Sequence, residues 1–391
     1  MKMKLKDVCD FYSGTGFPIQ YQGEKEGEYP FYKVSDIAQN VIAGKVYLEL
    51  CNNYISSGVA KTIKGCILPP KTVVFAKIGE ALKLNRRAIT NCECLIDNNA
   101  MGITPRPGSL RIQYFYFFMK NLKMQTLAES TTVPSVRKTI LENYEIEIPS
   151  LDEQKKIEEK LVLIQGIIEK RRRQLENLDN LIKARFVEMF GMPGTDAFGW
   201  GLVRLGSACN VNPKKSLDSR LVSGAEVSFV PMPAVTEHGE IDAIAIKEYD
   251  EVKTGFTYFA EKDVLFAKIT PCMENGKGAV AKGLHNGVGF GSTEFHVLRP
   301  ISGKTDPYWI YTLTAFPQFR MDAANNMTGS AGQRRVPASF LENYRVSLPP
   351  IALQNQFADF VRQTDKSKVV VSANIVYNIK RIKTEFINYY F

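Results

Sequence analysis

The chain has 391 residues, which is long enough for two domains. Of these residues 45% are hydrophobic and 23% are charged, a balance typical of a globular protein. It contains no apolar run of about 18 residues, which argues against a membrane-spanning protein. The net charge of +9 favours a polyanionic partner such as nucleic acid, although solubility alone is an equally good explanation of the charge.

An internal repeat with a separation of 200 residues organises the chain. LENYEIEIPSLDEQ at residues 141–154 recurs as LENYRVSLPPIALQ at residues 341–354. Further matches join residues 4–9 with 204–209, residues 181–190 with 381–390, and VVFAKIG at 73–79 with VLFAKIT at 264–270. We therefore interpret the chain as a tandem duplication, in which each copy has a variable segment followed by a segment of constant length.

The first variable segment, residues 1–150, predicts a mixed α/β domain. KTVVFAKIG at residues 71–79 combines β-branched and aromatic residues, which is typical of a buried strand. An aromatic segment of helical length follows at residues 109–127. The N-terminus lacks the apolar stretch of a secretory signal, and the seven cysteines contain no C-x-x-C motif. We therefore expect free thiols and a cytoplasmic location.

Residues 151–191 are expected to form a central spacer helix. Positions 151–190 contain no proline, and Ser150 with Glu153 makes a capping box before the first turn. Mostly apolar positions alternate in steps of four and three from 157 to 189, which predicts the seam of a coiled coil that ends at Arg185 and Met189. The apolar seam residues are Ile157, Leu161, Ile164, Ile168, Leu175, Leu178 and Ile182.

The second copy begins with a linker containing Gly and Pro, which ends at about residue 200. Residues 192–350 predict a second α/β domain, with strands in DVLFAKIT at 263–270 and STEFHVLRP at 292–300. The segment 306–324 is again aromatic and of helical length. Residues 351–391 predict a distal spacer helix with a more polar seam. Its apolar seam residues are Phe357, Val361, Val371, Ile375 and Ile382.

The two spacer helices have no other evident apolar partner, so we expect them to pack on each other. Two copies related by a pseudo-twofold axis would make the helices antiparallel, and each helix would span about 60 Å. The expected fold is α+β, with two mixed α/β domains separated by an antiparallel coiled coil of two long helices. Lys368 and Asn378 fall on the distal seam, where a polar residue can fix the register of pairing.

Catalytic and metal-binding residues have little support in the sequence. The three histidines, His238, His285 and His296, lack metal-ligand spacing with cysteine or with one another. RPISGKTD at residues 299–306 is similar to half of a phosphate-binding loop, but Leu298 stands where the first glycine is required. We therefore expect no catalytic residue and no metal site, and we expect that the chain is not an enzyme by itself.

The sequences around the repeated motif resemble the specificity subunits of type I restriction–modification enzymes. TTVPSVRKTILENYEIEIPSLDEQKKI at 131–157 and GSAGQRRVPASFLENYRVSLPPIALQNQF at 329–357 each run into a long helix, as in that family. FYKVSDI at 31–37 and FVPMPAV at 229–235 resemble the early strand of the family's target recognition domains, and both FAKI segments resemble their central strand. The second copy departs from the family pattern at Leu353, which replaces the glutamate of the capping box.

The resemblance implies that residues 1–150 and 192–350 are target recognition domains, each of which reads one half of a bipartite, asymmetric DNA target. The helix pair would set the unread spacer and dock two methyltransferase subunits, and ATP-driven restriction subunits would join the complex. S-adenosylmethionine, ATP and magnesium would bind to these partners and not to this chain. The alternatives are a non-enzymatic coiled-coil adaptor that binds DNA, or the specificity part of another methyltransferase or restriction system.

Two loops in each domain carry candidate DNA contacts. Lys and Arg can neutralise phosphates, while Arg, Asn and Gln have donors and acceptors that match base edges. In the first domain the candidates are Lys77, Lys83, Asn85, Arg86 and Arg87, with Thr131, Thr132, Ser135, Arg137 and Lys138. In the second domain they are Lys268, Asn275 and Lys277, with Ser330, Gln333, Arg334 and Arg335. Solvated surface is the simpler explanation for any single residue, but the occurrence of the loops at equivalent places in both copies favours DNA contact.

Overall fold

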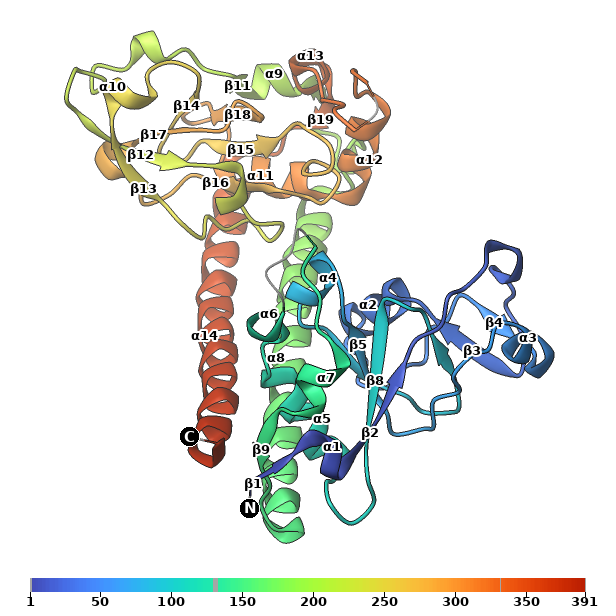
Figure 1. Ribbon diagram of the computed structural model, residues 1–391. Coiled ribbons are helices and arrows are strands. Elements are labelled where there is room, and N and C mark those ends of the chain that lie inside the picture. The colour runs from blue at the N-terminus through green and yellow to red at the C-terminus, as the bar shows by residue number, and fades with distance from the viewer. Residues whose placement is uncertain (1, 129–132, 331, 391) are drawn as a thin grey trace. The chain divides into compact units, whose positions relative to one another are not determined.

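The computed structural model describes residues 2–128, 133–330 and 332–390. The chain divides into two compact units, of which the first contains residues 1–170 and 374–391 and the second contains residues 171–373. Both units are mixtures of helices and strands (Figure 1). Each of the seven cysteines is a free thiol. No helix among the described residues is both long enough and apolar enough to cross a membrane.

A four-stranded antiparallel sheet forms the centre of each unit. In the first unit the strand order is β2 (Cys9–Ser13), β8 (Ala100–Pro105), β5 (Val73–Ala76) and β6 (Arg87–Ile89). In the second unit it is β11 (Cys209–Val211), β18 (Phe295–Pro300), β15 (Val264–Ala267) and β16 (Gly278–Val280). Equivalent strands occupy equivalent places in the two sheets, so the expected duplication is confirmed.

The strand β5 is apolar on both faces because both faces of its sheet are covered. Successive side chains of a strand point to opposite faces. Val73 and Phe75 belong to a core that includes Tyr114 and Phe115, whereas Val74 belongs to a separate core. The residues of β15 alternate between two cores in the same way. The unbroken apolar runs in the sequence are therefore buried strands, as predicted.

A smaller sheet and a short strand pair complete each unit. The first unit has the sheet β4 (Tyr54–Ile55), β3 (Tyr29–Tyr32) and β7 (Leu95–Ile96), and the pair β1 (Lys2–Lys4) with β9 (Glu145–Glu147). The second has β13 (Ala245–Glu248), β12 (Glu226–Val230), β17 (Val288–Gly291) and β14 (Thr257–Ala260), and the pair β10 (Leu202–Arg204) with β19 (Arg345–Ser347). Each short pair joins the first strand of a copy, β1 or β10, to the strand that follows the repeated sequence LENY, β9 or β19.

The two aromatic segments of helical length each form two consecutive helices. They are α5 (Ile112–Asn121) and α6 (Met124–Leu127) in the first unit, and α11 (Pro307–Ala315) and α12 (Pro317–Asn325) in the second. Pro317 disfavours helical backbone at the preceding residue, so α11 ends and α12 begins at this proline. Other short helices are α1 (Leu5–Val8), α2 (Val34–Ile42), α3 (Ser57–Thr62), α4 (Glu80–Lys83), α7 (Lys138–Glu142), α9 (Leu205–Ala208), α10 (Tyr249–Val252) and α13 (Ala338–Asn343).

The two spacer helices are α8 (Leu151–Phe190) and α14 (Ile351–Tyr390), each of 40 residues. The predicted capping box is present before α8. The Ser150 amide donates to Glu153 Oε2 at 2.9 Å, and the Glu153 amide donates to Ser150 Oγ at 3.3 Å. These bonds satisfy amides that have no partner within the helix, which explains why the helix begins at this point.

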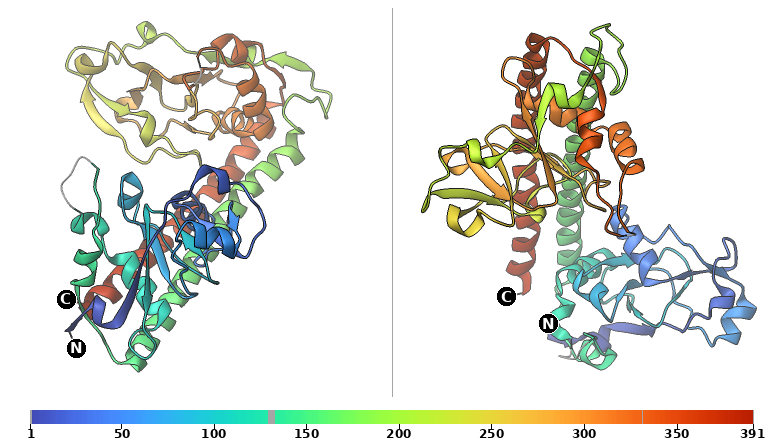
Figure 2. Two further views of the ribbon diagram at one scale, coloured as in Figure 1. Left: turned by 45° about the vertical axis from the view of Figure 1, so that its right-hand side comes forward. Right: turned by 90° about the horizontal axis from the view of Figure 1, so that it is seen from above.

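The helices α8 and α14 form an antiparallel pair (Figure 2). In the second unit, Phe186 and Phe190 near the end of α8 contact Phe357 near the start of α14, with ring centroids 5.5 and 5.4 Å apart. Asp179, farther from the end of α8, pairs with Lys368, farther from the start of α14, at 2.5 Å between Oδ1 and Nζ. Contacts that move back along one helix while they advance along the other require opposite helix directions.

Most of the predicted apolar seam residues are buried. Ile157, Leu161, Ile164, Ile168, Ile182, Phe357, Val361 and Val371 are buried, and Leu175, Leu178, Ile375 and Ile382 are half-buried. The predicted steps fail at the end of α8, where Phe186 and Phe190 are buried in place of Arg185 and Met189. The predicted seam assumes 3.5 residues per turn, whereas a straight helix has 3.6. The predicted positions therefore move around the helix by about 20° per heptad.

Lys368 lies on the distal seam, and its charge is neutralised within the second unit. Its side chain is 12% exposed and pairs with Asp179 at 2.5 Å and with Asp365 at 3.6 Å. The other carboxylate oxygen of Asp179 lies 3.4 Å from His238 Nδ1. These contacts allow a charged group to stay largely buried in the seam, since a buried charge without a partner would be strongly destabilising.

Candidate nucleic-acid interface

The two candidate loops of the first unit meet just after strand β5. The amide of Gly79 donates to the carbonyl of Pro134 at 2.8 Å, and the amide of Val136 donates to the carbonyl of Lys77 at 2.9 Å. Ile78 forms an antiparallel bridge with its partner in residues 134–136. The structure therefore joins two segments that the sequence places far apart.

The second unit has the same junction after strand β15. The amide of Thr270 donates to the carbonyl of Arg334 at 3.0 Å, and the amide of Val336 donates to the carbonyl of Lys268 at 2.9 Å. Ile269 and Arg335 form the antiparallel bridge, just as Ile78 and Ser135 do in the first unit. The shared backbone arrangement makes Lys77 equivalent to Lys268, and Ser135 equivalent to Arg335. Lys77 and Lys268 are both half-buried at their junctions.

The segment after β5 carries three further candidates with different surroundings. Lys83 is exposed and pairs with Glu80 at 2.6 Å. Asn85 has a left-handed backbone, with φ of 51°, and its Nδ2 donates to the carbonyl of Lys120 at 2.8 Å. Asn85 therefore fixes this turn in addition to any contact with a ligand, whereas the half-buried Arg86 stays a candidate contact.

Arg87 lies inside the first domain. Its side chain is 1% exposed, and its guanidinium lies 4.8 Å from the ring centroid of Phe75. It donates to Asn85 Oδ1 at 2.6 Å and to the carbonyl of Arg86 at 2.8 Å. Burial lowers the pKa of Arg87 to about 9. This position supports the loop from within, and we therefore leave Arg87 out of the proposed contact surface.

The later loop of the first unit is only partly within the described residues. Thr131 and Thr132 lie outside them. Ser135 is half-buried at the junction. Arg137 and Lys138 are exposed at the start of α7, where Lys138 pairs with Glu142 at 3.5 Å.

A hairpin closed by Thr328 and Arg335 carries the later loop of the second unit. Thr328 and Arg335 exchange backbone hydrogen bonds of 2.9 and 2.8 Å. Gly329 has a φ of +114°, and an added Cβ there would lie 2.9 Å from the Gln333 carbonyl oxygen, so the turn favours glycine. The exposed candidates at this hairpin are Ser330, Gln333 and Arg334.

Arg334 and Arg335 are both engaged within the second unit. Arg334 Nη2 donates to the carbonyls of Ala324 and Met327, at the end of α12, at 3.1 and 3.2 Å. Arg335 makes a two-bond ion pair with Glu294, at 2.9 and 2.8 Å. Sequence reasoning missed Glu294 because it lies 41 residues before its partner and belongs to no motif.

The loop between β15 and β16 carries Asn275 and Lys277, of which the first is exposed and the second half-buried. Arg320, another residue that the sequence did not reveal, supports this loop from inside. Its side chain is 6% exposed, and it donates to the carbonyls of Met273 and Gly276 at 3.1 and 3.3 Å. Burial lowers the pKa of Arg320 to about 10. Truncation of this side chain would remove one of two donors from the Met273 carbonyl, which also accepts from the Gly276 amide at 3.0 Å, and would remove the Arg320 bond from the Gly276 carbonyl.

His296 supports the junction of the second unit from strand β18. The carbonyl of Val336 can only accept, so Nε2 of His296 donates to it, at 2.8 Å, and Nδ1 accepts from Asn212 Nδ2 at 3.0 Å. Burial lowers the pKa of His296 below its usual value. In the first unit, Met101 occupies the strand position equivalent to that of His296. A titratable side chain is therefore present at this position in the second junction and not in the first.

We expect the protonation of His296 to reduce the stability of the second unit as the pH falls from 7 to 5, by up to about 1.4 kcal/mol per pH unit. The pKa of His296 is lower in the folded chain than in the unfolded chain, so the unfolded chain binds more protons over this range. His296→Met, which introduces the residue of the first copy, should reduce this dependence. Urea unfolding at several pH values provides the measurement. Lys268 and Glu294 face the imidazole and remain in the variant, so equal slopes in the two proteins would contradict the assignment.

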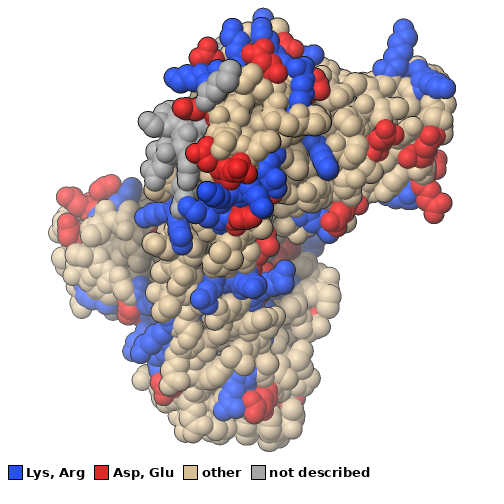
Figure 3. Space-filling model, turned by 90° about the horizontal axis from the view of Figure 1, so that it is seen from below, with Lys and Arg blue, Asp and Glu red and all other residues tan. Residues whose placement is uncertain are grey.

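Positive charge does not form one continuous stripe on the face drawn in Figure 3. Lys and Arg side chains form several groups there, with Asp and Glu side chains among them. Ion pairs such as Lys83 with Glu80 place anions beside candidate cations. No group of three or more His, Cys, Asp or Glu residues that could hold a metal ion occurs in the described part of the chain. On the face drawn, a polyanion would therefore meet separate groups of cations.

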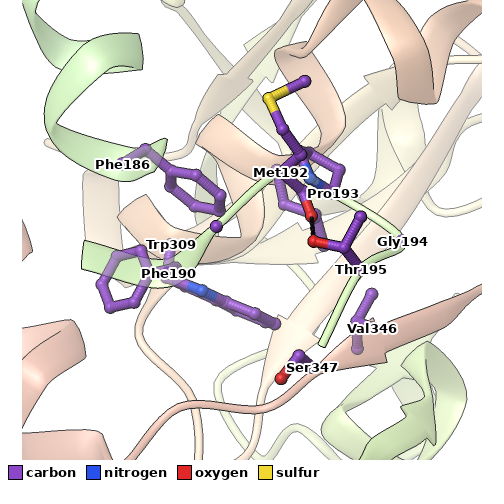
Figure 4. Close-up of a pocket in the computed structure, with 11 residues that line it drawn as sticks. Phe186, Phe190, Met192, Pro193, Gly194, Thr195, Trp309, Val346 and Ser347 are labelled. Atoms are coloured by element: carbon purple, nitrogen blue, oxygen red, sulfur yellow. Dashed lines mark hydrogen bonds between the residues drawn. The ribbon is translucent and has the colours of Figure 1, made fainter. Parts of the chain in front are cut away.

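A small hollow beside the end of α8 does not suit a substrate. Figure 4 shows the rings of Phe186, Phe190 and Trp309 around it, with the turn from Met192 to Thr195 on its other side. Thr195 Oγ1 donates to the Met192 carbonyl at 2.7 Å and tightens this turn. The hollow has room for about 10 Å³, which is close to the space needed for one water molecule.

Comparison with known proteins gives a consistent family assignment. The model of a family described as type I restriction modification DNA specificity domain matches residues 1–177 and 198–381. The type I restriction enzyme EcoEI specificity subunit of Escherichia coli is 44% identical over 154 residues, which cover 39% of this chain and 25% of that protein. The type I restriction enzyme MjaIX specificity subunit of Methanocaldococcus jannaschii is 21% identical over 97% of this chain and 90% of that protein. The match to the first relative thus spans about a quarter of its length.

One solved structure supports the fold. It comes from work on complex assembly and conformational transition of the type I R-M system, and it aligns with 100% of this chain and 95% of its own chain. The TM-score is 0.51 and the sequence identity is 16%, so this similarity concerns the fold alone.

Proposed function

The chain belongs to the family of type I restriction modification DNA specificity domains, and we propose that it is the DNA sequence-recognition subunit of a type I restriction–modification enzyme. The observation that carries this proposal is the recurrence of one loop junction in both units. Residues 77–79 meet 134–136 in the first unit, and residues 268–270 meet 334–336 in the second. Each junction would read one half of a bipartite, asymmetric DNA target.

The side chains at the junctions suit different parts of DNA. Lys77 and Lys268 occupy equivalent half-buried positions and would neutralise phosphates, which positions the domain without reading sequence. Asn275 and Gln333 are exposed and carry amides that can pair with the edge of adenine. One such paired contact is worth about 1–3 kcal/mol of discrimination between bases. Base reading by the second domain would therefore depend on few residues.

The helix pair would set the length of the unread spacer and offer the docking surface for two methyltransferase subunits. Restriction subunits would join this complex. S-adenosylmethionine, ATP and magnesium would be held by these partners. The present chain would place the complex on its DNA target, and the partners would catalyse the reactions. The histidines fit this proposal, because His296 and His238 have structural partners at a carbonyl and a carboxylate.

We expect the chain, assembled with its methyltransferase subunits, to enrich one bipartite sequence from a random duplex library. Binding should weaken steeply with salt, because six phosphate contacts would cost about 10³-fold in affinity between 50 and 200 mM salt. Lys77→Ala and Lys268→Ala should each weaken binding and reduce the slope of log affinity against log salt by about one. Fluorescence anisotropy over a salt series measures both quantities.

Lys25→Ala is the matched control, since Lys25 is exposed but lies outside both junctions. It should leave the salt slope nearly unchanged. Binding that does not respond to salt, or a complex that enriches no sequence, would contradict the proposal. Salt-dependent binding without any sequence preference would favour a coiled-coil adaptor that binds DNA.

A further inference from the structure

Arg335 and Glu294 form a two-bond ion pair at the second junction. Arg335 Nε lies 2.9 Å from Glu294 Oε2, and Nη2 lies 2.8 Å from Glu294 Oε1. The remaining terminal nitrogen, Nη1, donates to the carbonyl of Gln333 at 2.9 Å. All three guanidinium nitrogens of Arg335 therefore have partners inside the domain.

The ion pair connects two pieces of backbone that frame the hairpin. Glu294 lies just before β18, and its carbonyl accepts from the Lys268 amide at 2.9 Å. Arg335 forms the base of the hairpin through its two backbone bonds with Thr328. The bond from Arg335 to Gln333 lies within the hairpin itself. The side-chain pair thus fixes the position of the exposed Gln333 relative to the central sheet.

Among the residues that the structure describes, the junction of the first unit has no equivalent ion pair. The carbonyl equivalent to that of Glu294 belongs to Asn99, which accepts from the Lys77 amide at 2.8 Å. Ser135 stands at the place of Arg335, in the bridge to Ile78. The backbone junction is shared between the copies, but the charged contact is particular to the second. This difference points to a requirement of the second hairpin.

We propose that Arg335 is a positioning residue that, together with Glu294, holds the hairpin so that Gln333 meets the DNA. The proposal rests on the proposed function and refines its contact surface. We assign Arg335 this role in preference to DNA contact, because Glu294 balances its charge and three of its five N–H groups already donate inside the domain. The hydrogen bonds from Arg335 keep the pKa of Glu294 below its usual range, so the pair stays ionised at neutral pH.

Glu294→Gln separates a positioning role from direct contact by the sign of its effect. If Arg335 positions the hairpin, loss of the ion pair should weaken binding of the assembled complex to its target by about tenfold. If Arg335 contacts phosphate, the variant should bind more tightly, because a competing anion has been removed. Arg335→Lys keeps the charge but cannot form the two-bond pair, so the positioning role predicts that it binds as weakly as Arg335→Ala.

The same complexes should be measured with target DNA over a salt series. If Arg335 positions the hairpin, Arg335→Ala should leave the slope of log affinity against log salt unchanged. The Glu294→Gln/Arg335→Ala double variant should then bind DNA no more weakly than the weaker of the two single variants. Glu49→Gln, which breaks the Lys45–Glu49 pair away from both junctions and both spacer helices, is the matched control and should bind like the wild type. Tighter binding by Glu294→Gln, affinity retained in Arg335→Lys, or a salt slope lowered by about one in Arg335→Ala would each overturn the inference. A wild-type complex that selects no DNA sequence would instead contradict the proposed function.

Discussion

Removal of one heptad from each spacer helix should shorten the unread spacer of the preferred DNA target by about three base pairs. The helices α8 and α14 each contain 40 residues, and seven residues of α-helix span about 10 Å. Base pairs of B-form DNA are about 3.4 Å apart, so a change of about 10 Å corresponds to about three base pairs. Both half-sequences should stay the same, because no residue of either loop junction is removed.

The deletion should take residues 165–171 from α8 and residues 374–380 from α14. Each deletion removes two seam positions, so the apolar seam continues on nearly the same face of each helix. The assembled complex would then select from a library with fixed half-sites and a variable spacer. Deleting three residues from each helix is the control, because it turns the seam by about 60° and should destabilise the pair without defining a new spacer. A folded heptad-deletion variant with an unaltered spacer would contradict a measuring role for the helices.

The shortened variant should also bind more weakly than the wild type. Three base pairs correspond to almost a third of a turn of DNA, whereas removal of one heptad rotates a helix by only about 20°. The loop junctions would therefore meet their half-sites at a less favourable angle, and the Kd should rise. A shorter preferred spacer together with a higher Kd is the combined result that a stiff helix pair predicts.

The long helices could be predicted closely because their signals are local. The capping box at Ser150 and the apolar seam are both read within a few turns of one helix, and α8 and α14 begin at the expected residues, 151 and 351. The end of the α8 seam could not be read in the same way. Phe186 and Phe190 are chosen by contact with Phe357 from the other helix, which no local pattern of α8 contains.

The candidate loops could be predicted as a group, but the roles of their arginines could not. The repeat indicated that each copy has two such loops, and the structure joins them through backbone bonds in both units. Arg87 is nevertheless buried beside Phe75, and Arg335 is paired with Glu294. Both outcomes depend on tertiary neighbours, whereas the sequence reveals only that a cation is available. Strand order was unpredictable for the same reason.

Gln154 and Gln354 show what the repeated motif preserves. Both side chains are completely buried, with 0% exposure. Gln354 Oε1 accepts from the Asp306 amide at 2.9 Å, and its Nε2 donates to the carbonyls of Lys304 and Pro349 at 3.1 and 2.8 Å. Gln154 makes the equivalent bonds to Arg111, Ser109 and Pro149 at 2.8, 3.0 and 3.0 Å. Each glutamine therefore fastens the start of a spacer helix to the loop before α5 or α11.

Gln354→Leu should lower the free energy of unfolding of the second unit by about 3–5 kcal/mol. The substitution leaves one amide and two carbonyls without their partner, and each buried unsatisfied group costs about 1–3 kcal/mol, part of which the apolar side chain offsets. Gln356→Leu, on the exposed side of α14, should change stability by less than about 0.5 kcal/mol. Urea unfolding measures both effects, and hydrogen exchange at the Asp306 amide locates the first. Since that amide donates to Gln354, its exchange should accelerate well before global unfolding. An Asp306 amide that stays protected in Gln354→Leu would show that the loop before α11 is held by other contacts, and the role assigned to the repeated glutamine would be wrong.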